Sequence, residues 1–332
     1  MTLQDTSAKR VTAADIARSL GISRATVGFV LNETPGQTIS TGTRDRVLAE
    51  AKRLGYRPNN AARALASGHS RIVLLVLPDW PLDYSMRANL DEVSLALDEA
   101  GYSLVTMTPH PGGHALPLWE TLRPDVVMGM VPFSREQLEQ IRASGVAHII
   151  PSISAEEISR GEQLGFAVGP RMQVAHLVDR GRRRLAFAGS PDQRIADLVQ
   201  QRRTLAHAMS VDLTGEGLQA DQDLNEGSVA RVVAEWVDAG IDGVVAYNDD
   251  IAALVTGAAL RAGIRVPEML AIIGHDDTPL AKLFVPSISS VRIDSAGLGR
   301  YMAQLALSAA AGSPPPTAGP ESEAVLVARE TT

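Results

Sequence analysis

Two hydrophobic patterns divide this chain of 332 residues. Up to about residue 57, apolar residues recur at the three- and four-residue spacing of short amphipathic helices. Beyond Ser70, short apolar runs alternate with longer amphipathic stretches, which is typical of buried parallel strands separated by helices. The patterns therefore predict a small all-α domain followed by an α/β core.

The first two predicted helices form a helix-turn-helix. A helix over 12–20 begins at Thr12, a good N-cap residue, and stops at Gly21, which tolerates a left-handed backbone. Ser23 then caps a second helix over 24–31. Two helices joined by a three-residue turn that contains glycine are typical of DNA-binding domains.

A third helix, beginning near Ser40 or Thr43, completes the predicted domain. Its apolar positions are expected to face the other two helices; they are Val47, Leu48, Ala51 and Leu54. This packing would leave the polar side of the second helix free to enter a major groove. The same spacing is also compatible with a plain three-helix bundle.

The second helix carries side chains suited to reading bases. Arg24, Ala25 and Thr26 lie at its N-terminal end, and Phe29 follows one turn later. Arginine can donate two hydrogen bonds to the O6 and N7 atoms of guanine, whereas alanine or phenylalanine can contact the methyl group of thymine. We expect this side of the helix to face DNA.

Charge is distributed unevenly along the chain. Residues 1–71 hold eleven lysines and arginines against five acids and carry +6, whereas the remainder carries −13 and the whole chain −7. A basic arm on an acidic body indicates nucleic-acid binding, although chance clustering on a solvated surface would give the same count.

An ordered set of motifs runs through the N-terminal region: V-T-x-x-D-I-A, G-I-S-x-x-T-V, V-L-N, S-x-x-T-R-x-R-V and L-G-Y-x-P-N. The set resembles the headpiece of the lactose-repressor (LacI/GalR) family of bacterial transcription regulators. The resemblance implies base reading by Arg24, Ala25 and Phe29. It also implies phosphate contacts from Thr26, Asn32, Ser40 and Thr43.

One motif departs from the family. The family pattern T-V-S-R-V-L-N is T-V-G-F-V-L-N here, so Gly28 and Phe29 replace a hydroxyl and a cation. The replacements affect one phosphate contact and one base contact of the family, and they indicate an atypical operator.

A short linker follows the headpiece. Pro58 favours an extended chain before it, and Asn59 or Asn60 can cap a helix over 60–66 that is too short to be stable alone. In the resembled family two such helices, one from each subunit, pair in the minor groove. Asn59 and Leu65 match these hinge positions, and a leucine there wedges between base steps. A flexible linker is the alternative.

The α/β pattern of the core predicts two subdomains. Strands are expected at 72–77, 104–107, 126–130, 149–150, 185–188, 244–247, 270–273 and 324–327. Helices are expected at 87–100, 134–144, 172–180, 195–209, 227–239, 251–262 and 297–311. A core of this length is too large for a domain built on a single sheet. We therefore expect two doubly wound parallel-sheet subdomains, similar to periplasmic binding proteins.

The expected domains follow from these elements. They are a headpiece over 1–57, a hinge over 58–69 and a core over 70–332. Within the core, one subdomain covers about 70–167 and 293–316, and the other covers about 168–292 and 317–332.

Polar side chains cluster where the predicted strands end. Ligands of such sheets bind beyond the carboxyl ends of the strands, so Asp79 and Trp80 are candidate contacts for a small polar effector. Asn248 and Asp276 are further candidates, and they match effector-contacting positions of the resembled family. The other acids at these strand ends, Asp250 and Asp277, are expected to cap helices.

The core departs from the family pattern at two places. The effector-binding arginine of the family falls on Gln201, with Arg202 beside it. The family pair Asp-Asn is Gly169-Pro170 here. These departures weaken the expectation of a sugar effector, and a regulator that needs no effector is an alternative.

Other function classes find little support. The chain has no cysteine, and no phosphate-binding loop, dinucleotide-binding glycine motif or serine nucleophile elbow occurs in it. His110 and His114 lack a nearby acid or cysteine to complete a metal site. We expect neither cofactor nor metal, and no enzymatic activity. The polar N-terminus and the absence of a long apolar run predict a cytoplasmic protein with no membrane association.

The sequence thus predicts a dimeric transcription regulator, usually a repressor. Its expected partners are a near-palindromic DNA operator, a small-molecule effector such as a sugar or related metabolite, and a second copy of the chain. A solute-binding protein with the same core is the alternative, but the basic N-terminal domain argues against it. A sugar- or nucleoside-processing enzyme would need a catalytic set of residues that is not visible.

Overall fold

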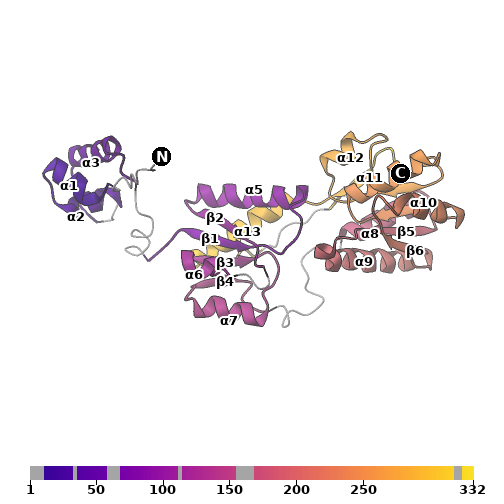
Figure 1. Cartoon of the computed structure of the whole chain (residues 1–332), viewed down its shortest axis with the longest axis horizontal. Helices are drawn as coiled ribbons and strands as arrows, with labels where there is room; N and C mark the ends of the chain where they lie inside the picture. The colour runs from indigo at the N-terminus through magenta and orange to yellow at the C-terminus, as the bar shows by residue number, and fades with distance from the viewer. Residues whose placement is uncertain (1–10, 33–35, 58–67, 111–113, 155–167, 318–323) are drawn as a thin grey trace, which may run out of the picture. The chain divides into compact units, whose positions relative to one another are not determined.

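The computed structural model describes residues 11–32, 36–57, 68–110, 114–154, 168–317 and 324–332. The chain forms two compact units, Met1–Arg71 and Ile72–Thr332 (Figure 1). The predicted hinge positions Asn59 and Leu65 lie outside the described residues. Within the described ranges, every helix is too short or too polar to span a bilayer.

Three helices build the N-terminal unit: α1 (Ala13–Leu20), α2 (Arg24–Leu31) and α3 (Thr41–Arg53). The predicted caps are confirmed. Asp15 accepts hydrogen bonds from the backbone N–H and the hydroxyl of Thr12, at 2.9 and 2.7 Å. Ser23 and Ser40 each accept a hydrogen bond from the backbone N–H three residues later. Gly21 ends α1 with a φ of 65°, which few residues other than glycine adopt.

The core of this unit is small and aliphatic. Its buried side chains are Ile16, Ala17, Val27, Val30, Val47 and Ala51. The prediction that Leu48 faces inward is wrong, because 49% of this residue is exposed. Val47 and Ala51 lie four residues apart on one stripe of α3, and Leu48 lies about 100° further around the helix. The sequence prediction therefore assigned too wide an apolar stripe to α3.

The first core sheet contains β1 (Ile72–Val76), β2 (Ser103–Met107), β3 (Val126–Gly129) and β4 (His148–Ile150). Neighbouring strands are parallel, in the order β2-β1-β3-β4. Helices α5 (Tyr84–Glu99) and α13 (Ser295–Ala310) pack on one face, and α6 (Leu118–Leu122) and α7 (Arg135–Ala143) pack on the other (Figure 1).

Strand β1 shows why a buried strand of this sheet has an uninterrupted apolar sequence. Val73 and Leu75 pack toward α5 and α13, whereas Leu74 and Val76 pack toward α6 and α7. Helix α13 lies close to α5, since a Cβ at Gly299 would come 2.4 Å from the carbonyl oxygen of Asn89. The chain therefore returns to the first sheet after building most of the second.

The second core sheet contains β5 (Leu185–Gly189), β6 (Ala220–Asp223), β7 (Gly243–Ala246) and β8 (Ala271–Ile273), in the parallel order β6-β5-β7-β8. The associated helices are α8 (Val168–Asp179), η1 (Gln193–Ile195), α9 (Ala196–Thr214), α10 (Val229–Asp238), α11 (Asp249–Arg261) and α12 (Pro279–Leu283). Helix α8 packs with α9, and α10 packs with α11. Two parallel-sheet subdomains are thus present, as predicted.

Some elements differ from the sequence prediction. The predicted strand at 324–327 is present as β10 (Val325–Val327), but it pairs antiparallel with β9 (Ser290–Arg292) instead of joining a parallel sheet. The elements β6, β9, α6 and α12 were not predicted. Strand β6 has the sequence Ala-Asp-Gln-Asp and lies at a sheet edge, where side chains need not be apolar.

Candidate functional site

Helix α2 has two faces with different roles. Val27 and Val30 are buried in the core of the N-terminal unit. Ala25 is exposed on the opposite side, Arg24 is exposed at the edge of that side, and Phe29 is half-buried. The three residues predicted to read bases therefore lie on the side of α2 that does not support the fold.

The residues predicted to contact phosphates lie near helix ends. Thr26 Oγ1 lies 2.8 Å from the Ser23 hydroxyl in the first turn of α2, and Thr43 Oγ1 lies 2.9 Å from the Ser40 hydroxyl in the first turn of α3. Asn32 is exposed at the C-terminal end of α2. Because the N-terminus of a helix presents unpaired N–H groups and a positive dipole end, the first two sites suit a phosphate.

Some cations of this unit are paired and others are not. Arg18 pairs with Asp15 at 2.9 Å, and Arg53 pairs with Glu50 at 2.6 Å. In the described part of the unit, four arginines form no ion pair: Arg24, Arg44, Arg46 and Arg57. These free guanidinium groups leave positive charge available to an anionic partner.

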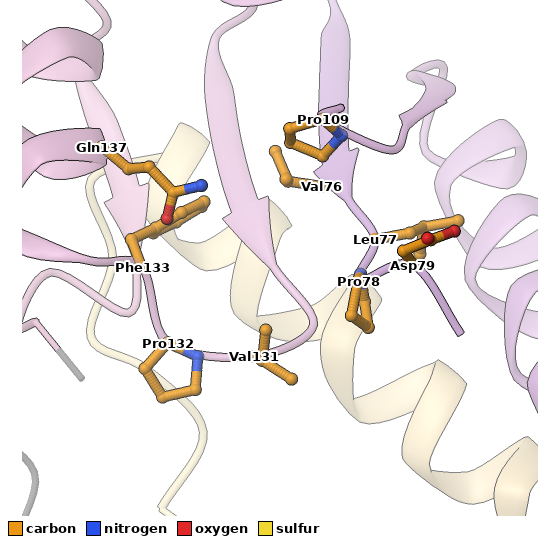
Figure 2. A pocket seen from close by; sticks show the side chains of 9 residues that line it. All are labelled: Val76, Leu77, Pro78, Asp79, Pro109, Val131, Pro132, Phe133 and Gln137. Atoms are coloured by element: carbon orange, nitrogen blue, oxygen red, sulfur yellow. The ribbon is translucent and has the colours of Figure 1, made fainter. Parts of the chain in front are cut away.

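A first cavity of about 150 Å³ opens at the carboxyl end of the first core sheet. Most of its lining is apolar; the residues are Val76, Leu77, Pro78, Asp79, Pro109, Val131, Pro132, Phe133 and Gln137. Figure 2 shows Phe133 and Gln137 on one side and Leu77, Pro78 and Asp79 on the other. Asp79 lies where the sequence predicted it, whereas Trp80 packs against the core of the second subdomain.

A second cavity of about 290 Å³ is lined by both subdomains. The start of α5 and the loops after β7 and β8 supply its residues: Asp83, Tyr84, Ser85, Asn248, Asp249, Asp250, Asp276, Thr278, Pro279 and Leu280. Four carboxyl groups therefore line one cavity. Burial raises the pKa of Asp83 and Asp250, and the charge of Asp276 raises them further.

Asp276 has two internal partners. Its Oδ1 atom lies 3.4 Å from Nη2 of Arg202 and 2.6 Å from Nδ1 of His275. The Arg202 guanidinium also donates a hydrogen bond to the carbonyl oxygen of Tyr247 and stacks 4.5 Å from the centre of its ring. The side chains of Arg202 and Asp276 are only 13% and 10% exposed, so this ion pair is largely shielded from water.

The ion pair sets the charge states around it. Burial alone would raise the pKa of Asp276, but Arg202 and His275 outweigh burial and hold it well below its usual range. Burial lowers the pKa of His275, and the nearby Arg202 charge lowers it further. Near neutral pH we therefore expect an ionised Asp276 beside a neutral imidazole.

Asp249 was not among the predicted site residues, yet it joins the loops around the second cavity. Its carboxyl group accepts hydrogen bonds from the Ser290 hydroxyl and from the backbone N–H of Thr278, both at 2.6 Å. Burial raises its pKa to about 6 despite these hydrogen bonds. In the sequence it is one of two consecutive acids after a strand, and nothing local distinguishes it from Asp250.

The prediction that Asp250 and Asp277 cap helices is wrong. Asn248 caps α11, since its side-chain oxygen accepts a hydrogen bond from the N–H of Ile251 at 3.0 Å. Asp277 instead pairs with Arg329 and with Arg292. Asp83 was missed because it looks like an ordinary cap, and it does cap α5 through the N–H of Met86.

Two departures from the expected motif can now be located. Gln201 lies on α9 and is not among the residues that line the two cavities described. Gly169 lies against His275, and a Cβ at this glycine would come 2.0 Å from Nε2 of the imidazole. Because Gly169 has no side chain, the imidazole of His275 can occupy this space.

Comparison with protein families matches two parts of the chain. Residues 12–59 match the model of bacterial regulatory proteins of the lacI family, and residues 174–332 match a periplasmic binding protein-like domain. The transcriptional regulator GalS of Salmonella typhimurium is 30% identical over 317 residues, which cover 91% of each chain. The transcriptional regulator GntR of Pseudomonas aeruginosa is 29% identical over 97% of this chain and 96% of its own.

Solved structures share the fold over almost the whole length. A lac repressor dimer bound to operator and the anti-inducer ONPF matches with a TM-score of 0.77 and 21% identity, covering 97% of this chain and 99% of that one. A complex of the transcriptional regulator CelR with cellobiose matches with a TM-score of 0.61 and 24% identity, covering 97% and 100%.

A helix-turn-helix unit joined to a binding-protein-like α/β core defines the class of DNA-binding transcription regulators that respond to small molecules. This chain belongs to the lacI family of bacterial regulatory proteins. The family resemblance inferred from the headpiece motifs is confirmed.

Proposed function

We propose that the chain is a transcription repressor that binds a near-palindromic operator as a homodimer. The observation that carries the proposal is the outward side of α2, which supports no part of the fold and belongs to a basic helix-turn-helix unit. The similar lac repressor structure is a dimer bound to operator. A two-fold symmetric protein reads a two-fold symmetric site, which makes the operator palindromic.

The headpiece residues take the roles that the sequence predicts. Bases are read by Arg24, Ala25 and Phe29, and phosphates are contacted by Thr26, Asn32, Ser40 and Thr43. Asn59 and Leu65, outside the described residues, form the minor-groove hinge. The surface positions of the seven described residues support this assignment.

The effector binds at the carboxyl ends of the two core sheets. Its proposed contacts are Asp79, Trp80, Gln201, Arg202, Asn248 and Asp276. Asn248 uses its side-chain oxygen to cap α11, which leaves its amide nitrogen to donate to a ligand. Arg202 is engaged with Asp276 and Tyr247, so its main role is to orient the Asp276 carboxylate toward the ligand.

Effector binding controls DNA binding through the core. A ligand held by both subdomains changes the spacing of the two hinges in the dimer and shifts the population that binds operator. A second candidate is a regulator that needs no effector. The internal pairing of Arg202 with Asp276 favours this candidate, because it satisfies both charges without a ligand.

The remaining parts of the proposal follow from the DNA-binding role. The relatives are transcription regulators, and we propose that this chain likewise catalyses no reaction. Because the bacterial chromosome lies in the cytoplasm, we propose that the chain acts there.

Footprinting on DNA from around the protein's own gene, at physiological salt, tests the proposal. A protected near-palindromic site is expected, and pools of metabolites added to the same assay should weaken or strengthen protection. Uniform protection that modest salt abolishes would show non-specific binding and contradict the proposal. A specific site that no metabolite affects would favour the effector-independent candidate.

A further inference from the structure

The outward face of α2 has an unusual chemistry for a surface that meets DNA. At about 100° per residue, Ala25, Gly28 and Phe29 lie on the side of α2 opposite the buried Val27 and Val30. This face therefore presents a methyl group, a bare backbone and an aromatic ring. Arg24 lies at the edge of the face and carries its only charge.

Phe29 does not serve the fold of the N-terminal unit. The partly buried hydrophobic side chains that pack on its core, among the described residues, are Ala13, Leu20, Ile22, Leu31, Ile39, Leu54 and Tyr56. Phe29 is not one of them. A lone surface phenylalanine would need no explanation, but this one lies four residues after Ala25, so the two side chains are neighbours on one helix face.

Gly28 is not required by the folded chain either. A Cβ at this position would meet no atom within 4 Å, and its backbone is not left-handed. A glycine inside a helix costs about 0.5–1 kcal/mol relative to alanine. The fold therefore leaves open space beside the Gly28 backbone, which a partner of α2 can approach closely.

Charge complementarity identifies that partner as DNA. The face lies in a unit whose Arg24, Arg44 and Arg46 form no ion pair in the described part of the chain. Residues 1–71 carry a net charge of +6. An apolar strip with a free guanidinium group at its edge, in a unit of net positive charge, fits a major groove, where thymine methyl groups lie between two phosphate backbones.

We propose that Ala25 and Phe29 recognise thymine through its C5-methyl group, and that Gly28 lets α2 approach the base edges closely enough for this contact. The inference rests on the proposed function and specifies its operator. Bases opposite Ala25 and Phe29 are thymines, and guanine is read only at the edge of the face, by Arg24.

The test begins with the operator. The full-length protein selects binding sites from random duplex DNA at physiological salt. Each thymine of the selected site is then replaced singly by deoxyuridine, which removes the methyl group and keeps every hydrogen-bonding atom. Fluorescence anisotropy gives the Kd for each duplex.

We expect deoxyuridine to weaken binding about fourfold at each contacted thymine, the effect of exposing one buried methyl group. In the Phe29→Ala protein one of these positions should lose its sensitivity. Leu48→Ala is the control, because it removes an exposed hydrophobic side chain from a different helix of the same unit. Its response to deoxyuridine should equal that of the unmodified protein.

Two results would overturn the inference while leaving the proposed function intact. One is a selected site in which every deoxyuridine changes Kd by less than about twofold. The other is that every sensitive thymine keeps its full sensitivity in both the Phe29→Ala and the Ala25→Gly protein. Failure to select any site would instead contradict the proposed function, and the inference with it.

Discussion

Replacing Arg202 with methionine should lower the free energy of unfolding of the core, because it leaves the Asp276 carboxylate without its positively charged partner. The charged atoms are 3.4 Å apart, so their gross attraction is about 5 kcal/mol at an effective dielectric constant of about 20. Both side chains are at most 13% exposed. Removing one member of such a pair costs about 3 kcal/mol or more, since the remaining charge stays buried.

The cost should depend on pH. Without Arg202, only His275 opposes the effect of burial, so the pKa of Asp276 rises and the variant's carboxyl group takes up a proton as the pH falls. In the unmodified protein the pKa is low and the group stays ionised. The difference in free energy of unfolding should therefore be largest near neutral pH and shrink as the pH falls and the variant's carboxyl group is protonated.

Urea unfolding followed by tryptophan fluorescence measures the cost. The three tryptophans, Trp80, Trp119 and Trp236, all lie in the core unit, so the signal excludes the headpiece. Arg194→Met is the control, because the Arg194–Asp192 pair is 49% and 28% exposed and, as a solvated surface pair, should contribute little to stability. A loss for Arg202→Met no larger than that of the control, or one that does not change with pH, would refute this reasoning.

Three further variants test other parts of the structure. Ser23→Ala removes the cap of α2 and should lower the stability of the headpiece by about 1 kcal/mol, measured by thermal unfolding with circular dichroism; an unchanged melting temperature would contradict the role of the cap. Gly28→Ala should stabilise the headpiece by about 0.5–1 kcal/mol yet weaken operator binding, so equal or tighter binding in anisotropy would count against close approach of DNA. Burial raises the pKa of Asp249 in the folded protein from its ordinary value of 3.8 to about 6, so this group favours folding at low pH and its contribution declines as the pH rises through this window. Asp249→Asn should remove that decline from urea unfolding curves, and an unchanged pH dependence would show that Asp249 is not the group responsible.

Features set by neighbouring residues could be predicted from the sequence. The side chains of Asp15, Ser23 and Ser40 each accept a hydrogen bond from a backbone N–H three residues away, so local sequence specified the start of each headpiece helix. The apolar core strands were also predicted, because burial on both faces leaves an uninterrupted hydrophobic run. Strand β6 was not predicted, because an edge strand can be polar and still pair through its backbone.

Features that depend on distant residues could not be predicted. Arg202 and Asp276 are 74 positions apart, and only the fold brings them together. His275 and Gly169 are even further apart in the sequence, so their close approach had no local sign. Asn248 was a candidate ligand contact, yet only the structure shows that its oxygen already caps α11. Which of two consecutive acids becomes buried likewise depends on loops from elsewhere in the chain.

The ratio of two dissociation constants tests specific DNA recognition by this chain most directly. Full-length protein is titrated at physiological salt with its selected operator and with a scrambled duplex of the same length and composition. A specific regulator of this kind should bind the operator at least about a thousandfold more tightly. Equal affinity for both duplexes, falling steeply with salt, would mean that the basic headpiece binds only the phosphate backbone and that the chain is not a sequence-specific regulator.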